Sequence, residues 1–422
     1  MVPVTHCTFV SRRTSDSRLQ YRIANEARAT LIDTALSDDG WISTSGDEWN
    51  LWWGRQRPRG GSPRGPRLVS HLAGARCLED EAERYRLLWS AHNAASAASS
   101  MYVPRTFEMP GGRSELLRVA AETPDAIRIA KANAPASRSG LRILAAASDA
   151  PHESGVMIQE YVSTPDPIDG ITHTVRVYVL VSSLDPLVVH LFRDVFVTPV
   201  VQPIARTHTA FSDPSVVRTH RDDILRNTPE RRVPISTSSK MAQADIAARW
   251  TQIQHIATMT ILAARDTLLI QQRQIAGFSS FAIVGMDVLF DASGKGWLIG
   301  CHLPLFLDTE ADAVIESDER QSTVRMVRDA VRLVLAAAQS DGSATAHART
   351  VLESAGQFEL LVPSDMAATA DEMWLPRRKD RALFEAAGVR PPSTRTVQWP
   401  VAATILTMAL LRSWNISSRS SR

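Results

Sequence analysis

The chain has 422 residues, which is enough for two or three sub-domains that share one large buried core. Hydrophobic residues make up 44% and charged residues 22%, as in ordinary globular proteins. The net charge of +2 excludes a global electrostatic attraction to nucleic acid or to an anionic membrane. Three scattered cysteines form neither a Cys-x-x-Cys metal pair nor a disulfide framework, so a reducing compartment is favoured.

We expect no membrane span. The segment from Met1 to Arg13 lacks the apolar core of a signal peptide. The longest late apolar run, Trp399 to Leu411, is shorter than the roughly 20 residues that a spanning helix needs. A helix docked on the protein is the preferred interpretation of this run, with a tail anchor as the alternative.

The first hundred residues are predicted to mix short strands and helices. An apolar segment begins at Leu31 to Ala35, and Trp41, Trp49, Trp52 and Trp53 then mark a predicted strand pair. Tryptophan clusters of this kind are typical of core packing.

A loop is predicted from Gly54 to Arg67, because glycine and proline at this density forbid regular structure. The segment carries five arginines and no acidic residue. It is either a solvated insertion or a patch that binds an acidic polypeptide or another polyanion.

Two helices and two strands are predicted next. The helices cover Cys77 to Ala95 and Ser114 to Ala121. The strands cover Ala126 to Ala130, which ends at Lys131, and Leu141 to Ala145.

Three strands rich in valine, isoleucine and tyrosine follow, at Val156 to Tyr161, Val175 to Ser182 and Leu187 to Val197. Residues 201–240 are polar and interrupted by proline, which predicts a long mobile loop. Apolar residues then recur at helical spacing over residues 242–275, which predicts a long helix.

The last predicted elements are two strands and a helix. The strands, Phe281 to Phe290 and Gly296 to Cys301, are joined by a turn at residues 291–294. The helix covers Gln321 to Ala338. Beyond about residue 340 the chain is rich in alanine and serine and then basic, so we expect it to be partly disordered.

Four segments together resemble the ordered motifs of a known family. They are Tyr102 to Pro110, similar to "iPxTfxLP"; Ile127 to Lys131 with Ser137 to Leu141, similar to "WIvKP…sRGxGI"; Val156 to Val162 with Pro167 to Gly170 and Val175 to Val181, similar to "vvQkYi…PlLidGkKFDlRvYvLv"; and Phe281 to Asp291 with Trp297 to Ile299, similar to "FELfGfDvllD…pWLlEvN". The family is that of the tubulin–tyrosine ligases. The resemblance implies an α/β fold of the ATP-grasp type, with an N-terminal sub-domain (residues 1–100), a central one (101–182), a C-terminal one (183–340) and a tail (341–422).

The resemblance makes Lys131 the lysine that neutralises the α- and β-phosphates of ATP. At the end of an apolar strand a bare ammonium is costly unless it faces an anion. Ser137, Arg138 and Gly140 correspond to the loop that closes over the phosphates through backbone amides. This loop is one residue shorter than in the family and keeps one glycine where the family has two.

In the family, one strand forms a hinge that contacts the adenine of ATP. Gln159 and Tyr161 occupy the corresponding position in this chain, so we expect the adenine there. Arg176 interrupts an apolar run and therefore points to the face opposite Val175 and Val177. In the family this arginine faces the γ-phosphate and the acyl-phosphate, a task that suits its fixed fork of donors.

Two positions that handle the substrate in the family differ in this chain. Thr174 stands where the family has aspartate, and Thr172 stands where a lysine is common. In the family these side chains help to hold the acceptor and the amino acid.

The metal site departs further from the family pattern. Asp287 matches the first metal-binding carboxylate, but Gly300 replaces the family's glutamate and His302 replaces its asparagine. Glycine has no ligand side chain, and imidazole is a poor partner for hard Mg²⁺. We expect weak or single-ion Mg²⁺ binding, with Asp308 or Glu310 as an alternative source of a ligand.

The resemblance implies ATP-dependent ligation of an amino acid to a carboxylate of a tubulin tail through an acyl-phosphate, with ATP and Mg²⁺ as cofactors. We expect the degraded metal site to lower or abolish this activity. The alternative is a non-catalytic relative that binds tubulin, microtubules or nucleotide as a scaffold or regulator. Either function implies a location in the cytoplasm, at the cytoskeleton or in a cilium or flagellum, and neither involves nucleic acid.

Overall fold

The computed structural model of the chain describes twelve stretches of residues. They are 18–24, 30–54, 65–94, 101–132, 142–144, 146–168, 171–185, 187–200, 243–273, 277–303, 317–339 and 356–362. Several predictions concern residues outside these stretches: the loop at 201–240, most of the arginine-rich segment, the phosphate-closing residues Ser137, Arg138 and Gly140, the alternative ligands Asp308 and Glu310, and the apolar run at 399–411.

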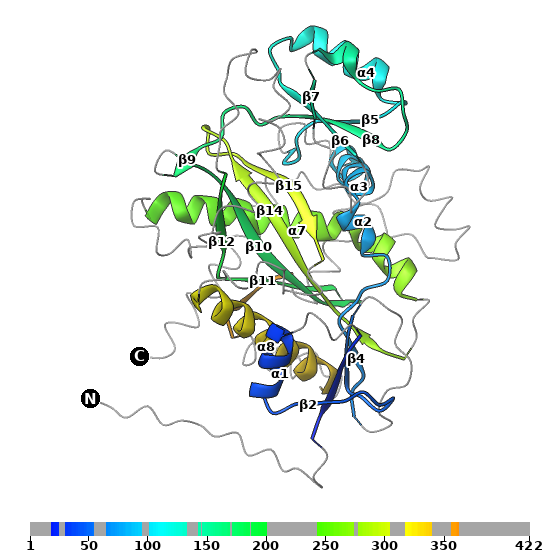
Figure 1. The fold of residues 1–422 in the computed structure, drawn as a ribbon, viewed down its shortest axis with the longest axis vertical. Helices are drawn as coiled ribbons and strands as arrows, with labels where there is room; N and C mark the ends of the chain where they lie inside the picture. The colour runs from blue at the N-terminus through cyan, green and yellow to red at the C-terminus, as the bar shows by residue number, and fades with distance from the viewer. Residues whose placement is uncertain are drawn as a thin grey trace, which may run out of the picture.

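The described strands form three sheets, which lie one above another along the long axis of the molecule (Figure 1). The lower, N-terminal sheet has the order β13-β4-β3-β1-β2. Its strands are β1 (Gln20–Ile23), β2 (Ile42–Ser43), β3 (Leu51–Trp53), β4 (Leu68–Val69) and β13 (Ser279–Ser280), and they are covered by α1 (Thr30–Asp38) and α8 (Ser317–Gln339).

The upper, central sheet has the order β5-β8-β6-β7. Its strands are β5 (Thr106–Glu108), β6 (Arg128–Ala132), β7 (Arg142–Leu144) and β8 (Val156–Glu160). One face packs on α4 (Arg113–Glu122) and on a short 3-10 helix at Ala147–Asp149, and this contact forms a separate small core. The other face carries the side chains of Lys131 and Gln159, which are discussed below.

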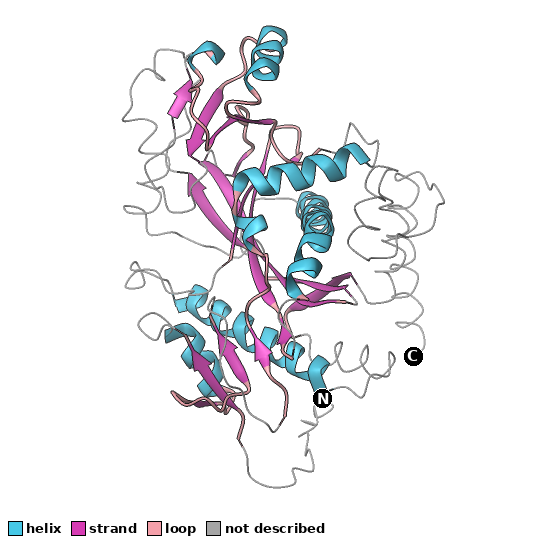
Figure 2. Cartoon of the chain, turned by 90° about the vertical axis from the view of Figure 1, so that its right-hand side faces the viewer, coloured by secondary structure: helices cyan, strands magenta, loops and turns pink. Residues whose placement is uncertain are grey.

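The middle sheet has the order β15-β14-β10-β11-β16, with β9 and β12 also paired to β10. Its strands are β9 (Pro167–Ile168), β10 (Ile171–Leu184), β11 (Leu187–Phe192), β12 (Phe196–Val200), β14 (Ala282–Phe290), β15 (Gly296–His302) and β16 (Phe358–Val362). The long helix α7 (Gln243–Gln272) crosses one face together with α2 (Arg76–Glu79) and α3 (Glu81–Ala94), as Figure 2 shows from the side.

The alternation of side chains along β10 explains how two cores share this sheet. Val175, Val177 and Val179 face α7 in the largest core. Tyr178 and Leu180 point the other way and join α1 and α8 in a second core. The elements therefore confirm the predicted α/β organisation.

Three expectations need correction. The predicted tryptophan-rich strand pair is wrong, because β2 and β3 lie on either side of β1 and run parallel to it. The expected sub-domain boundary at residue 182 does not coincide with a sheet boundary, because β10 pairs with β14 instead of the central sheet. A strand was also missed in the tail: β16 pairs with β11 and buries Phe358, a contact that its alanine- and serine-rich surroundings do not indicate.

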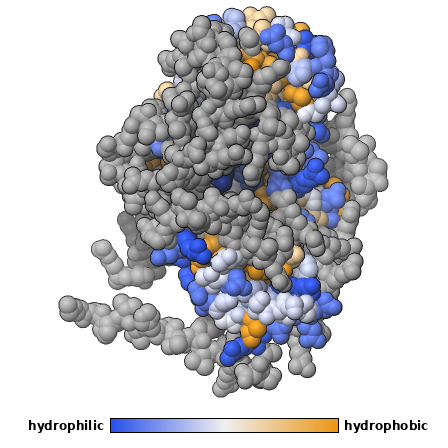
Figure 3. Space-filling view, viewed as in Figure 1, coloured by the Kyte–Doolittle hydropathy of each residue, from blue (hydrophilic) through white to orange (hydrophobic). Residues whose placement is uncertain are grey.

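The visible described surface is largely hydrophilic, with small separate hydrophobic areas (Figure 3). Ile42, Trp89, Leu117 and Ile270 are the large hydrophobic residues with exposed side chains in the described ranges, and they lie on different elements. Within those ranges, no helix combines the length and the apolarity that crossing a bilayer requires.

Candidate active site

The predicted site residues on the middle sheet lie on the face opposite α7. Along β10 this face is apolar at Tyr178 and Leu180 and becomes polar at Arg176. Arg176 on β10 is in register with Asp287 on β14, and Asp287 is in register with Gly300 on β15. His302 lies two residues beyond Gly300 and thus on the same face. The structure confirms that Arg176 points away from Val175 and Val177, which are buried on the α7 side.

Asp287 accepts hydrogen bonds from two neighbouring side chains. The Arg176 Nε atom lies 2.7 Å from Oδ1, and Arg176 Nη2 lies 2.9 Å from Oδ2. The Nε2 atom of His302 lies 2.8 Å from the same Oδ2. The guanidinium fork therefore binds the carboxylate bidentately, and the imidazole completes a three-residue cluster.

The electrostatics of Asp287 follow from these contacts. Burial alone would raise the pKa of its carboxyl, but the positive charge of Arg176 and the hydrogen bonds from His302 and Arg176 outweigh burial and lower the pKa. The carboxylate is thus ionised and paired within the protein.

These residues do not fit a Mg²⁺ ion. A hard cation needs several oxygen ligands, whereas the cluster offers one carboxylate whose oxygens already accept hydrogen bonds, one imidazole and a glycine. A Cβ atom on Gly300 would lie 3.3 Å from both Asp287 Oδ2 and His302 Nε2, so His302 crowds the space of the missing glutamate. Nowhere in the described residues do three His, Cys, Asp or Glu side chains gather as a metal site.

A second cluster surrounds Lys131 on the central sheet. Its Nζ atom lies 2.7 Å from Gln159 Oε1 and 2.8 Å from Glu81 Oε1, and both Lys131 and Glu81 are mostly buried. Glu81 belongs to the first turn of α3, whose start is capped by the Asp80 carboxylate accepting from the N–H of Glu83. The structure thus brings together two predicted residues, Lys131 and Gln159, and adds an acidic one that the sequence did not indicate.

Tyr161 directly follows the end of β8. Its backbone N–H donates to the carbonyl of Ile127 at 2.8 Å, so the sheet already uses this donor. Burial raises the pKa of Tyr161 to about 12, which keeps the phenol neutral.

The corner between α2 and α3 contacts the Lys131 cluster and the residue that follows His302. Glu79 Oε1 accepts from the N–H of Leu303, directly after His302, at 3.0 Å, while Glu81 binds Lys131. Glu79 and Glu81 are two residues apart, so their Cα atoms are separated by at most about 7.6 Å. The Lys131 cluster and the strand end that carries His302 therefore meet the same corner.

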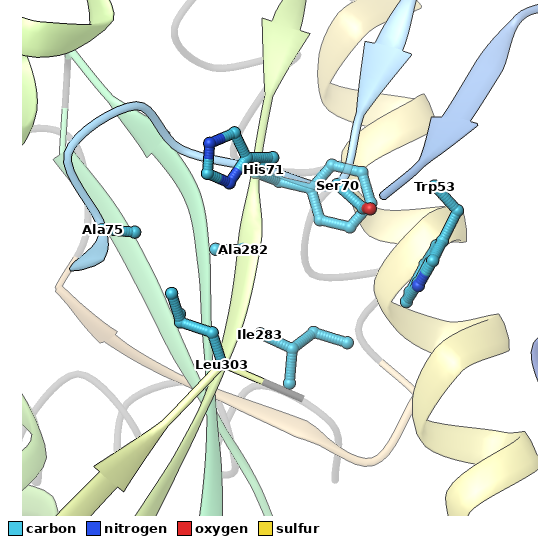
Figure 4. A pocket seen from close by; sticks show the side chains of 8 residues that line it. Trp53, Ser70, His71, Ala75, Ala282, Ile283 and Leu303 are labelled. Carbon is cyan, nitrogen blue, oxygen red and sulfur yellow. The ribbon is translucent and has the colours of Figure 1, made fainter. Parts of the chain in front are cut away.

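A small pocket lies beside this corner, on the side of the N-terminal sheet (Figure 4). Its space is about 350 Å³, including the open mouth. It is lined by Trp53, Ser70, His71, Ala75, Phe281, Ala282, Ile283 and Leu303. Its lining includes none of the predicted site residues, so it is separate from the two clusters.

Comparison with known proteins identifies the family to which this chain is similar. The model of the tubulin-tyrosine ligase family matches residues 78–302, which include every predicted site residue. The human "Tubulin polyglutamylase TTLL7" is 24% identical over 222 residues, which cover 47% of this chain and 25% of the relative. The mouse "Tubulin monoglutamylase TTLL4" is 24% identical over 281 residues (62% and 24%), and the Danio rerio "Tubulin polyglutamylase ttll6" is 24% identical over 249 residues (53% and 31%).

The chain spans about a quarter to a third of the length of these curated relatives. The family match itself covers more than half of the chain and extends across the central and middle sheets that hold the two clusters. The chain therefore belongs to the tubulin-tyrosine ligase family and has the family's ATP-grasp-like fold.

Proposed function

We propose that this protein binds ATP between the central and middle sheets and associates with tubulin, and that its ligase activity is abolished or greatly reduced. The observation that carries the proposal is the pairing of Asp287 with Arg176 and His302. In the ligation chemistry that the family resemblance implies, the arginine faces the transferred phosphate and the carboxylate faces a metal. Here the two side chains neutralise each other.

Nucleotide binding is supported by the Lys131 cluster. The ammonium group is mostly buried and held by two side-chain oxygens, so it is presented in one position to an incoming phosphate. Mg²⁺ would be carried by the phosphates of ATP rather than by protein carboxylates, because one carboxylate is present where the family pattern has more.

A second candidate function is a weakly active ligase. Lys131, Arg176 and Asp287 are all retained, and the names of the relatives describe glutamate addition to tubulin. Such an enzyme would add an amino acid to an acidic protein tail through an acyl-phosphate, with Arg176 released from Asp287 when ATP binds.

Melting the protein with and without ATP tests the proposal. A ligand at 100 times its dissociation constant stabilises the native state by about 2.7 kcal/mol, which raises Tm by several degrees. We expect this rise with ATP in EDTA and a similar rise with ATP and Mg²⁺. Lys131→Met should remove it.

The outcomes separate the candidates. A rise that requires Mg²⁺ would favour the weakly active ligase, and amino-acid transfer to tubulin should then be assayed. No shift at millimolar ATP in either buffer would refute nucleotide binding.

Tubulin association is proposed to use the arginine-rich segment 54–67. Its last residue, Arg67, is exposed, and its guanidinium carbon lies 5.4 Å from the centre of the Phe278 ring. The acidic tails of tubulin are the partner that this charge complements. The proposal implies a location at microtubules, in the cytoplasm or in a cilium or flagellum.

Replacing the five arginines of this segment by glutamine should weaken co-sedimentation with microtubules, most strongly at low salt, because screening weakens exposed charge pairs. A matched control replaces five exposed arginines elsewhere: Arg18, Arg76, Arg105, Arg273 and Arg320. If the two variants bind microtubules equally well at low salt, the segment is not the contact.

A further inference from the structure

The ion pair between Lys131 and Glu81 occupies the ammonium group that is proposed to bind a phosphate. An ammonium group has three N–H donors. Two of them are used by Glu81 and Gln159, at 2.8 Å and 2.7 Å. Among the described residues these two contacts use two of the three donors, so a phosphate that binds this nitrogen comes close to the Glu81 carboxylate.

The neutral partner is fixed by a chain of hydrogen bonds. The Thr106 hydroxyl donates to the Pro104 carbonyl at 2.9 Å, so its oxygen accepts from Gln159 Nε2, also at 2.9 Å. The amide of the buried Gln159 can therefore present only its oxygen to Lys131. Of the two groups that accept from the lysine, Gln159 is neutral and oriented by Thr106, and Glu81 is the one that carries a negative charge.

Glu81 also belongs to a different structural unit from Lys131. Leu78 and Leu88, on either side of Glu81, pack in the core of the middle sheet. Lys131 is on the central sheet, which has its own core with α4. The pair therefore joins the two sheets between which the nucleotide is proposed to bind.

We propose that Glu81 is an internal substitute for a nucleotide phosphate: it occupies Lys131 when no nucleotide is bound and is displaced by the phosphates of a nucleoside triphosphate. This inference rests on the proposed function, because it requires that ATP binds at Lys131. A carboxylate and a phosphate on one ammonium repel each other, and the repulsion is strong where water is largely excluded. Glu81 thus weakens nucleotide binding, and its release loosens α3 from the central sheet.

Glu81→Gln tests the inference by isothermal titration calorimetry. The glutamine keeps a carbonyl oxygen for Lys131 and loses the negative charge. We expect ATP to bind about tenfold more tightly to this variant at low salt, ADP to gain less and adenosine to gain nothing, because the gain comes from like-charge repulsion of phosphate. The gain should shrink as salt is added.

The matched control is Glu108→Gln. Glu108 forms another ion pair between α3 and the central sheet, with Arg86 at 3.2 Å, but both side chains are about half exposed. Its substitution should leave ATP affinity unchanged. The same measurement in a Lys131→Met background should show no gain from Glu81→Gln, because the shared ammonium is gone. Glu81→Ala serves as a second variant if Glu81→Gln does not fold.

The outcomes distinguish this inference from the proposed function. If the wild type binds ATP and neither Glu81→Gln nor Glu81→Ala binds it more tightly, the displacement of Glu81 is refuted while nucleotide binding stands. A gain in ATP affinity that persists without Lys131 would also refute the inference. Such a gain would come from the changed net charge of the protein and not from the contact with Lys131. If neither the wild type nor any variant binds ATP, both proposals fail together.

Discussion

A variant that carries both Gly300→Glu and His302→Asn should ligate an amino acid to tubulin at least about 100-fold faster than the wild type. The pair of changes restores the two ligand types that the family motif has on β15, next to Asp287. Metal ions contribute several kcal/mol to the stabilisation of developing charge, and each 1.36 kcal/mol is a tenfold change in rate. The assay is the incorporation of labelled glutamate or tyrosine into purified tubulin with ATP and Mg²⁺.

The geometry of β15 requires both substitutions. A side chain at residue 300 begins 3.3 Å from the His302 ring and from the Asp287 carboxylate. Gly300→Glu alone therefore crowds the imidazole and places two carboxylates side by side. His302→Asn alone leaves a single carboxylate. Both single variants serve as controls and should stay inactive.

Two results would contradict this interpretation. If the double variant binds Mg²⁺ and ATP and remains inactive, the loss of activity lies elsewhere, and Thr174 is the next position to change. If the wild type is already active and the double change has no effect, the assignment of Gly300 and His302 to the family's ligand positions is wrong.

Asp287→Asn should lower the free energy of unfolding by about 2 kcal/mol at neutral pH. It leaves the charge of Arg176 without its bidentate partner, and breaking a fully buried pair costs 3–5 kcal/mol. The cost is smaller here because 31% of the Arg176 side chain is exposed, compared with 15% for Asp287. Urea denaturation of the two proteins measures the difference.

The difference should also depend on pH. The pKa of Asp287 is lowered in the folded protein, so its contribution to stability is fully present above the pKa of an unfolded aspartate, about 3.9. Below that pH the contribution falls, because the unfolded aspartate takes up a proton while the native carboxylate stays ionised until its own lower pKa is reached. The advantage of the wild type over Asp287→Asn should therefore shrink as the pH drops below about 4.

Asp47→Asn is the control for this measurement. Asp47 pairs with Arg22 at 3.1 Å, but 83% of its side chain is exposed. Loss of an exposed pair should change stability by less than about 1 kcal/mol. If Asp287→Asn behaves like this control, the cluster on β14 does not stabilise the fold.

The sequence was sufficient to predict those parts of the site that follow from the alternation of side chains between the two faces of a strand. Arg176 breaks an apolar run on β10, and this period of two is sufficient to place it on the face opposite Val175. Lys131 was predicted at the end of an apolar strand, and the structure places it inside β6, in register with Met157. The turn and the strand pair that carry Asp287 and Gly300 also follow from a local pattern.

The partners of these residues could not be predicted in the same way. Glu81 is 50 positions from Lys131 and looks like an ordinary acidic residue in the first turn of a helix. Thr106 has no local signal for orienting Gln159. The sequence predicted that Gly300 offers no metal ligand, but it could not predict the contact of His302 with Asp287, which depends on the register of two strands.

The second core sets a limit on how this protein can be rearranged by recombination. Leu180 and Ile283 lie inside the family-matched segment 78–302, and they are covered by Leu36 and Val331, which lie outside it. The strand β13 lies immediately before β14 and inside the matched segment. It is paired with β4, which lies outside that segment. A genetic exchange that transferred residues 78–302 alone would expose this apolar face to water, so both flanks must be inherited with the segment they cover.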